Sequence, residues 1–333
     1  MMRNLIAKLT VCVFGSLLFI KAAGADPDFW KYEWPNTDFT KTSVNFQEIL
    51  SGGPPKDGIP AIDNPIFAPV GKISGISKNE PVITVEISGK ARAYPLQVLM
   101  WHEIVNDELA GIPISVTFCP LCNASIVFDR RLKREGGSDL VLDFGTTGKL
   151  RNSDLVMYDR QTESWWQQFT GEAIVGDLTG ESLTMIPARI ESFNRLKSRF
   201  PEAEVLLPNN PNARAYGKNP YVGYDSLDVP FLYRGEYPAN VAPLSRVVAV
   251  GEHVWSLDYI RKEKRIETQD GIIVEWEKGQ NSALDAAIIG EGTDIGNIIA
   301  YKMVNNKPID VVYRVDFAFA YHAFHPDKKI ITK

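Results

Sequence analysis

The sequence concentrates its chemistry in one short motif, Cys119-Pro120-Leu121-Cys122. Two cysteines at this spacing serve a metal site, a redox-active thiol pair or a short-loop disulfide. A loop closed over two residues restrains the unfolded chain very little, so stapling explains the pair poorly. The third cysteine, Cys12, lies in an apolar run near the N-terminus. The motif therefore predicts metal binding first, redox chemistry second and an inert disulfide third.

The residues around the motif favour a metal knuckle over a redox helix. Reactive thiols of the thioredoxin type lie at a helix N-terminus. Here Ala124–Phe128 alternates like a strand, as Ile114–Phe118 does before the motif. We therefore expect both cysteines at the tip of a β-hairpin, with Asn123 in the left-handed conformation that Asn tolerates next best after Gly. A c-type haem is excluded because Asn, rather than His, follows Cys122.

One knuckle supplies only two ligands, so others must come from elsewhere. His102 is the nearest histidine in sequence, on a predicted helix, and Glu103 beside it could orient the imidazole. The alternative is a hydrogen-bonded core histidine. Two thiolates with an imidazole or thioether suit Cu(I), and Cys₂His₂ suits Zn(II), so copper is expected before zinc. The predicted ligands are Cys119, Cys122 and His102, with Met100, Met157 or His325 as candidates for a fourth.

A second polar cluster could form a ligand-binding wall. It ends in two tryptophans, and Arg160 within it could clamp an anion. The alternative is an ion-paired turn with the rings buried behind it. The loop Tyr216–Tyr224 would face this wall. Neither a nucleophile elbow around Ser164 nor a nucleotide-binding loop at Gly145–Lys149 is predicted, because the glycine spacing is wrong for both. The cleft candidates are Asp159, Arg160, Thr162, Ser164, Trp165 and Trp166.

The elements that must position these residues are short and mostly extended. Further strands are expected at Val82–Ile87, Ala91–Tyr94, Leu140–Phe144 and Leu155–Tyr158, with a turn at Gly145–Gly148, and helices at Pro95–Val105 and Ile190–Phe200. In the last third, Val247–Val250 and the residues after it are similar to the stretch that begins at Val82. The sequence thus predicts a β-rich α+β fold with two related strand-rich halves packed together.

The N-terminal residues show the pattern of a secretory signal peptide. Arg3 and Lys8 give a basic start, the apolar run Leu9–Ile20 is short of the ~20 residues that span a bilayer, and Ala23-Gly24-Ala25 offers a cleavage site. We expect an extracytoplasmic protein, periplasmic or secreted, with no membrane span after cleavage; an uncleaved anchor is the alternative. The expected divisions are 1–25 signal peptide, 26–57 N-terminal arm, 58–200 cysteine-bearing unit and 201–333 second strand-rich unit.

The composition is that of an ordinary globular protein. Of 333 residues, 44% are apolar and 23% charged, and the formal net charge is -5. Because no part is strongly basic, nucleic acid is not an expected partner. The expected partners are a metal ion or a redox protein. Two alternatives to metal binding stay open: a thiol–disulfide oxidoreductase using Cys119 and Cys122, and a non-catalytic ligand-binding or scaffold protein with an inert disulfide.

Several stretches resemble the signature of a bacterial exported family known only as a domain of unknown function. They are TFCPLCNASIVFDR at 117–130, the residues 93–99 with 102–107, FGTTGKL at 144–150 with MYDRQTESWW at 157–166, and Phe324-His325-Pro326. The resemblance implies an exported location. It also implies that His102 and the cysteine turn form one site, and it brings no assigned activity.

Overall fold

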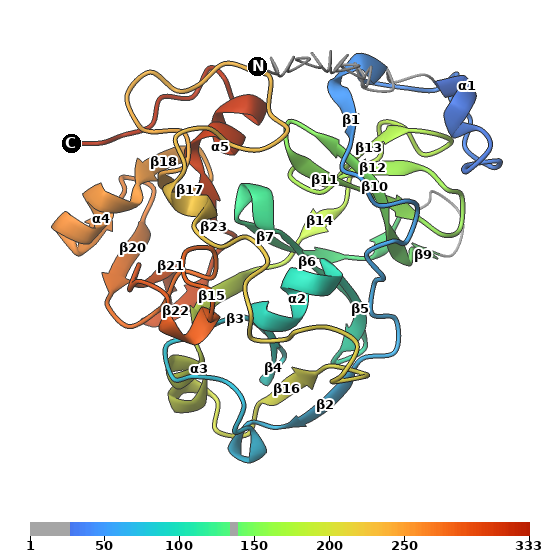
Figure 1. The fold of residues 1–333 in the computed structure, drawn as a ribbon. Helices are drawn as coiled ribbons and strands as arrows, with labels where there is room; N and C mark the ends of the chain where they lie inside the picture. The colour runs from blue at the N-terminus through green and yellow to red at the C-terminus, as the bar shows by residue number, and fades with distance from the viewer. Residues whose placement is uncertain (1–26, 134–138) are drawn as a thin grey trace, which may run out of the picture.

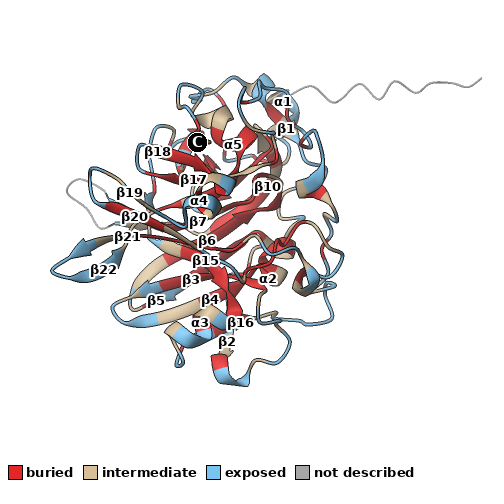
Figure 2. Cartoon of the chain, turned by 90° about the vertical axis from the view of Figure 1, so that its left-hand side faces the viewer, coloured by how far each residue is buried: buried red, intermediate tan, exposed pale blue. Residues whose placement is uncertain are grey.

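The structure is a computed structural model that describes residues 27–133 and 139–333. The predicted signal peptide lies outside the described residues. Short helices pack against several mostly antiparallel sheets, so the predicted β-rich α+β class is confirmed (Figure 1). The strands through the middle of the molecule are buried, and exposed residues gather in the surrounding loops (Figure 2). Among the described residues, no helix is long and apolar enough to cross a membrane.

The first strand-rich unit carries the cysteines. Its elements in chain order are β2 (Ile66–Pro69), β3 (Pro81–Ile87), β4 (Lys90–Pro95), α2 (Leu96–His102), β5 (Ile104–Leu109), β6 (Ile112–Cys119), β7 (Ala124–Asp129), β14 (Thr184–Met185), β15 (Ala188–Ser192), α3 (Phe193–Arg199) and β16 (Glu204–Leu207). One sheet has the strand order β15-β3-β4-β16-β2 and the other the order β14-β7-β6-β5.

The second unit has β17 (Arg246–Val250), β18 (His253–Ser256), α4 (Leu257–Glu263), β19 (Arg265–Glu267), β20 (Ile272–Glu277), β21 (Asn297–Val304), β22 (Lys307–Asp310), β23 (Arg314–Phe317) and α5 (Ala318–Phe324). Its sheets have the orders β18-β17-β23 and β19-β20-β21-β22.

A further sheet is formed by the residues between β7 and β14. Its strands are β10 (Phe144–Arg151), β11 (Asp154–Asp159), β12 (Trp165–Gln167) and β13 (Glu172–Val175), and β1 (Ile49–Ser51) pairs with β10 at its edge. The remaining short elements are α1 (Pro27–Trp30), β8 (Arg131–Leu132) and β9 (Leu140–Val141).

The two units repeat one arrangement, as the sequence predicted. A central strand, β3 or β17, pairs with two antiparallel neighbours, and each neighbour continues directly into a seven-residue helix. An antiparallel meander follows the first of these helices in both units. Strands of the two units also lie next to each other, since β23 lies beside β7 and β15 lies beside β21 (Figure 1). The hairpin that bears the cysteines therefore packs against the second unit.

One backbone detail fixes the correspondence between the units. Glu103 ends α2 with φ 58° and ψ -31°, and Lys264 ends α4 with φ 64° and ψ -36°. The carbonyl of each accepts a hydrogen bond from the middle strand of its meander, from Phe118 N at 2.8 Å and from Trp276 N at 2.9 Å. The cysteine turn of the first unit thus corresponds to the β20–β21 connection of the second.

Several predicted boundaries were wrong, and the strand expected at Leu140–Phe144 is divided between β9 and β10. The helix expected to reach Val105 ends at His102, because the positive φ of Glu103 turns the chain into β5, which pairs along its length with β6. The turn expected at Gly145–Gly148 lies inside β10 and is a bulge between Thr146 and Lys149. The helix expected from Ile190 begins only at Phe193, since residues up to Ser192 pair with β3. In each case strand pairing overrides a local pattern.

Candidate metal centre

The cysteines lie on the hairpin tip that the sequence predicted. Cys119 is the last residue of β6 and pairs with Ala124 of β7, and residues 120–122 form a 3-10 turn. Asn123 follows with φ 51° and ψ 26°, in the expected left-handed conformation. Its side-chain amide donates a 2.7 Å hydrogen bond to the carbonyl of Val315 in β23. The second unit therefore anchors the tip.

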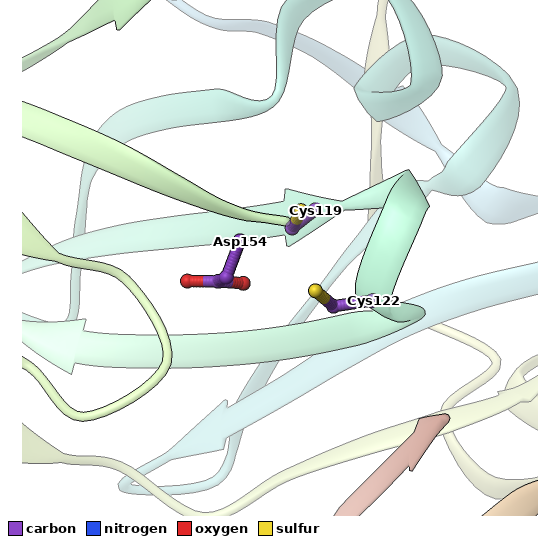
Figure 3. Close-up of side chains that lie close together, drawn as sticks. All are labelled: Cys119, Cys122 and Asp154. Atoms are coloured by element: carbon purple, nitrogen blue, oxygen red, sulfur yellow. The ribbon is translucent and has the colours of Figure 1, made fainter. Parts of the chain in front are cut away.

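A buried carboxylate completes the group. Asp154 opens β11, just after the tight turn Asn152-Ser153, in which both residues have positive φ. The two sulfurs and a carboxylate oxygen of Asp154 all lie within 4.8 Å of one another, and all three residues are buried. Figure 3 shows the Asp154 carboxylate beside the two thiols. Among the described residues, Cys119, Cys122 and Asp154 are the Cys, His, Asp or Glu side chains that form a group of three or more close enough to share an ion.

One oxygen of Asp154 is satisfied and the other is not. Oδ2 accepts hydrogen bonds from Gln167 Nε2 at 2.7 Å and from the Phe169 backbone at 2.9 Å. Oδ1 is buried and has no N–H or O–H donor among the described residues, although a hydrogen bond from the Cys119 thiol lowers the pKa of this carboxyl. Burial raises the pKa of Asp154 to about 7. Leaving a buried polar atom unpaired costs about 1–3 kcal/mol, so the oxygen needs a proton or a cation.

The thiols have weak partners of their own. Cys119 Sγ lies 3.8 Å from the carbonyl oxygen of Ser153, and Cys122 Sγ lies 4.0 Å from that of Asn152. The two cysteines are not joined by a disulfide. Burial raises the pKa of Cys119, and it raises that of Cys122 well above the ordinary range. Without a cation, both sulfurs are therefore held as thiols.

Two more buried acidic residues, Glu103 and Asp316, lie near the two cysteines and Asp154. Burial, and then the charge of Asp154, raise the pKa of Glu103 to about 8. Burial raises the pKa of Asp316 to about 6, although Arg314 Nε lies 3.3 Å from its carboxylate. So many acidic groups in one buried region disfavour one another's ionisation. A bound cation would offset this repulsion.

A cavity of about 230 Å³ adjoins Cys119. Its charged lining residues are Glu103 and Lys149, both buried. Lys149 Nζ lies 3.4 Å from a carboxylate oxygen of Glu33, whereas the Glu103 side chain makes no hydrogen bond or ion pair within the described chain. The rest of the lining is mostly apolar: Gly52, Pro54, Ile59, Leu121, Thr146, Gly148, Leu150, Leu155, Tyr221, Phe231 and Leu232.

His102 is placed outside the sulfur and carboxylate group. Its Nδ1 lies 2.8 Å from the carbonyl oxygen of Pro60, which can only accept, so Nδ1 carries the proton. Its Nε2 then accepts from the Tyr216 hydroxyl at 2.8 Å. Burial lowers the pKa of His102. Both ring nitrogens are therefore engaged, which fits the alternative of a hydrogen-bonded histidine.

His325 does not belong to this group either. His325 lies at the end of α5, where its Nε2 is 3.4 Å from an Arg314 nitrogen and its ring packs against Tyr321. Met100 and Met157 are buried in the same hydrophobic core as the cysteines. Sequence reasoning missed Asp154. Its only signal is a carboxylate at the start of the otherwise apolar stretch before Tyr158.

The predicted cleft residues make internal contacts. Trp165 and Trp166 are fully buried. Asp159 accepts from Trp166 Nε1 at 2.9 Å and from the Thr162 backbone at 2.6 Å, and the Thr162 hydroxyl lies 2.7 Å from that of Ser164. Arg160 pairs with Asp63 at 2.5 Å. These contacts fit the alternative of an ion-paired turn. Tyr221, from the loop Tyr216–Tyr224 that was predicted to form part of the same cleft, instead lines the cavity beside Cys119.

Fold and site together define a duplicated β-rich protein with a buried group of side chains able to hold a cation. The chain belongs to the family described as "Protein of unknown function (DUF3179)", whose model matches residues 56–328. The resemblance carried by the cysteine motif is thereby confirmed. The matched range includes the hairpin, Asp154, the cavity acid Glu103 and nearly all of the second unit. A comparison with curated proteins found no match, and a comparison with solved structures found none.

Proposed function

We propose that this protein is an extracytoplasmic metal-binding protein in which Cys119, Cys122 and Asp154 hold the ion. The observation that carries the proposal is the buried Asp154 Oδ1, which has no N–H or O–H donor in the described chain and belongs to a carboxylate next to two buried thiols. A cation there would satisfy the oxygen and take the place of the thiol protons. The extracytoplasmic location rests on the N-terminal sequence pattern alone.

The donor set ranks Zn(II) before Cu(I), the reverse of the ranking from the sequence. Cu(I) prefers soft sulfur ligands, whereas Zn(II) readily accepts a carboxylate with two thiolates. Charge favours the same order, because three anionic ligands leave a net charge of -1 on Zn(II) and -2 on Cu(I). Zinc–ligand bonds of about 2.0–2.3 Å require donor atoms roughly 3.5–4 Å apart, so closing the present group needs shifts of only about 1 Å.

The oxidoreductase alternative has weaker support. A catalytic thiol of that type has a lowered pKa at an exposed, electropositive position. Here burial raises the pKa of Cys119, and the nearest charged groups are acidic. A buried thiol of this kind attacks disulfides slowly. The arrangement suits a metal ligand better than a nucleophile.

Metal uptake by purified, reduced protein tests the proposal. Elemental analysis together with thiol counting should find about one Zn(II) per chain. The double variant Cys119→Ser, Cys122→Ser should lose it, and Asp154→Asn should weaken Zn(II) binding at least tenfold while changing Cu(I) binding much less. Unchanged zinc stoichiometry in the double variant would refute the proposal.

His102→Ala is the matched control for the third ligand. It removes a ring whose two nitrogens already have partners, so zinc uptake should remain. Loss of zinc in His102→Ala with retention in Asp154→Asn would instead assign the third ligand to the imidazole, as the sequence suggested.

A further inference from the structure

The cavity beside Cys119 is larger than metal binding requires. Cavities of about 150 Å³ already hold benzene, and this one measures about 230 Å³. Its walls come from parts of the chain that are distant in sequence: the segment Gly52–Ile59, Glu103 with the cysteine turn, the neighbouring strands β10 and β11, and the loop Tyr221–Leu232. Because these walls are mostly apolar, they suit the body of a small organic molecule.

Glu103 is the charged lining group that lacks a partner. It is 8% exposed, and its carboxyl makes no hydrogen bond or ion pair with any described residue. Lys149, the other charged lining residue, already pairs with Glu33. At the equivalent position of the second unit, Lys264 places its ammonium over the Trp276 ring, 3.7 Å from the centroid. The buried acid is therefore particular to the unit that carries the cysteines.

We propose that the cavity binds a small molecule with a branched aliphatic or aromatic body and one hydrogen-bond-donating head group, an amine or a hydroxyl, which pairs with Glu103. A donor head group supplies the contact that the carboxyl lacks, whereas a carboxylate head group would meet Glu103 and the nearby Asp154. Cys119 lines the cavity, so an occupant would lie at the open side of the proposed three-ligand metal site. The position of the bound molecule relative to the ion therefore rests on the proposed function.

A series of probes with one body and four head groups tests the assignment. Calorimetry on reduced, metal-free protein should find that benzyl alcohol or benzylamine binds at least tenfold more tightly than toluene or benzoate. Glu103→Leu should abolish this preference. Glu103→Gln should keep benzyl alcohol binding, because the amide oxygen still accepts, and lower any benzylamine binding. Equal binding of all four probes, tighter binding of benzoate, or an unchanged preference in Glu103→Leu would overturn the proposal.

Two further variants separate this inference from the metal proposal. Glu80→Gln makes the same change at a buried glutamate that does not line the cavity, so probe binding should be unaffected. Cys122→Ser removes a predicted metal ligand that does not line the cavity, so it should lose zinc and keep probe binding. Zinc uptake without probe binding overturns the cavity assignment alone, and probe binding without zinc uptake overturns the metal proposal alone.

The placement beside the metal has its own readout. In cobalt-substituted protein, the visible spectrum should shift when the preferred probe is added, because the occupied cavity adjoins the ligand Cys119. A probe that binds without any spectral change would show that the cavity does not open onto the ion, and that part of the proposal would fall.

Discussion

Replacing Asp154 by Asn should stabilise the metal-free protein at alkaline pH and weaken its stabilisation by zinc. Burial raises the pKa of Asp154 from its ordinary 3.8 to about 7. The folded state therefore keeps a proton that the unfolded state has lost between these pH values, so stability falls as the pH rises through this window. The full cost is present above pH 7. At about 1.4 kcal/mol per pH unit, it amounts to about 4 kcal/mol.

An amide avoids this cost but has one defect of its own. Its oxygen can accept from Gln167 Nε2 and the Phe169 backbone as Oδ2 does, while its NH₂ group takes the unpartnered place of Oδ1. That unpaired group costs about 1 kcal/mol. Asp154→Asn should thus be about 3 kcal/mol more stable than the wild type at pH 8.5. The difference should vanish near pH 4.5, where only about 1 kcal/mol of the carboxylate cost remains.

Urea unfolding in a chelator, repeated with excess zinc, measures both effects. Zinc at a hundred times the wild-type dissociation constant should stabilise the wild type by about 2.7 kcal/mol and Asp154→Asn, which binds at least tenfold more weakly, by about 1.4 kcal/mol or less. Asp159→Asn, at the other end of β11, is the control. Its carboxylate accepts from Thr162 and Trp166 and is not one of the three proposed ligands, so the variant should keep the zinc response. The reasoning fails if Asp154→Asn is less stable than the wild type in chelator at pH 8.5.

The remaining predictions concern the fold around the site. Burial raises the pKa of Glu80 to about 7, so wild-type stability should fall between pH 4.5 and 7. Chemical unfolding should find Glu80→Gln about 2 kcal/mol more stable at pH 8, because its NH₂ group takes the unpartnered place of Oε1, and an unchanged pH profile would contradict this. In Gly148→Ala the new Cβ would lie 2.0 Å from the carbonyl oxygen of Pro54, so thermal unfolding should show a loss of at least about 2 kcal/mol, with loss of probe binding. Gly89→Ala, whose Cβ meets nothing within 4 Å, should cost only about 1 kcal/mol and keep probe binding.

The features that the sequence predicted well are local ones. The hairpin follows from period-two patterns on both sides of a short turn, and the left-handed Asn123 from the few residues that tolerate positive φ. The duplication was visible because both copies keep similar strand and turn residues at their starts. The wrong boundary after His102 shows the limit of this reasoning. Helical spacing of apolar residues continues into β5, and only pairing with β6 decides the conformation there.

The missing ligand shows a second limit. Asp154 lies beside the hairpin because β11 and its preceding turn pack against it, with the carbonyl oxygen of Ser153 3.8 Å from Cys119 Sγ. No sequence spacing encodes that contact. His102 was preferred because it is close in sequence, yet its partners are Pro60 and Tyr216, which are distant in sequence. The cavity is equally non-local, because its walls come from several segments that are distant in sequence.

The duplicated fold argues that the buried acids serve binding rather than folding. The second unit builds the same three-stranded sheet, helices and meander, with Lys264 at the position of Glu103 and the β20–β21 connection in place of the cysteine turn. The architecture thus forms without thiols or a buried carboxyl at these places. In the first unit, Glu103 and Asp154 both have pKa values raised by burial, so they cost stability at neutral pH. Because Glu103 and Asp154, unlike Glu80, lie beside the cysteines or line the cavity, we attribute them to the proposed binding.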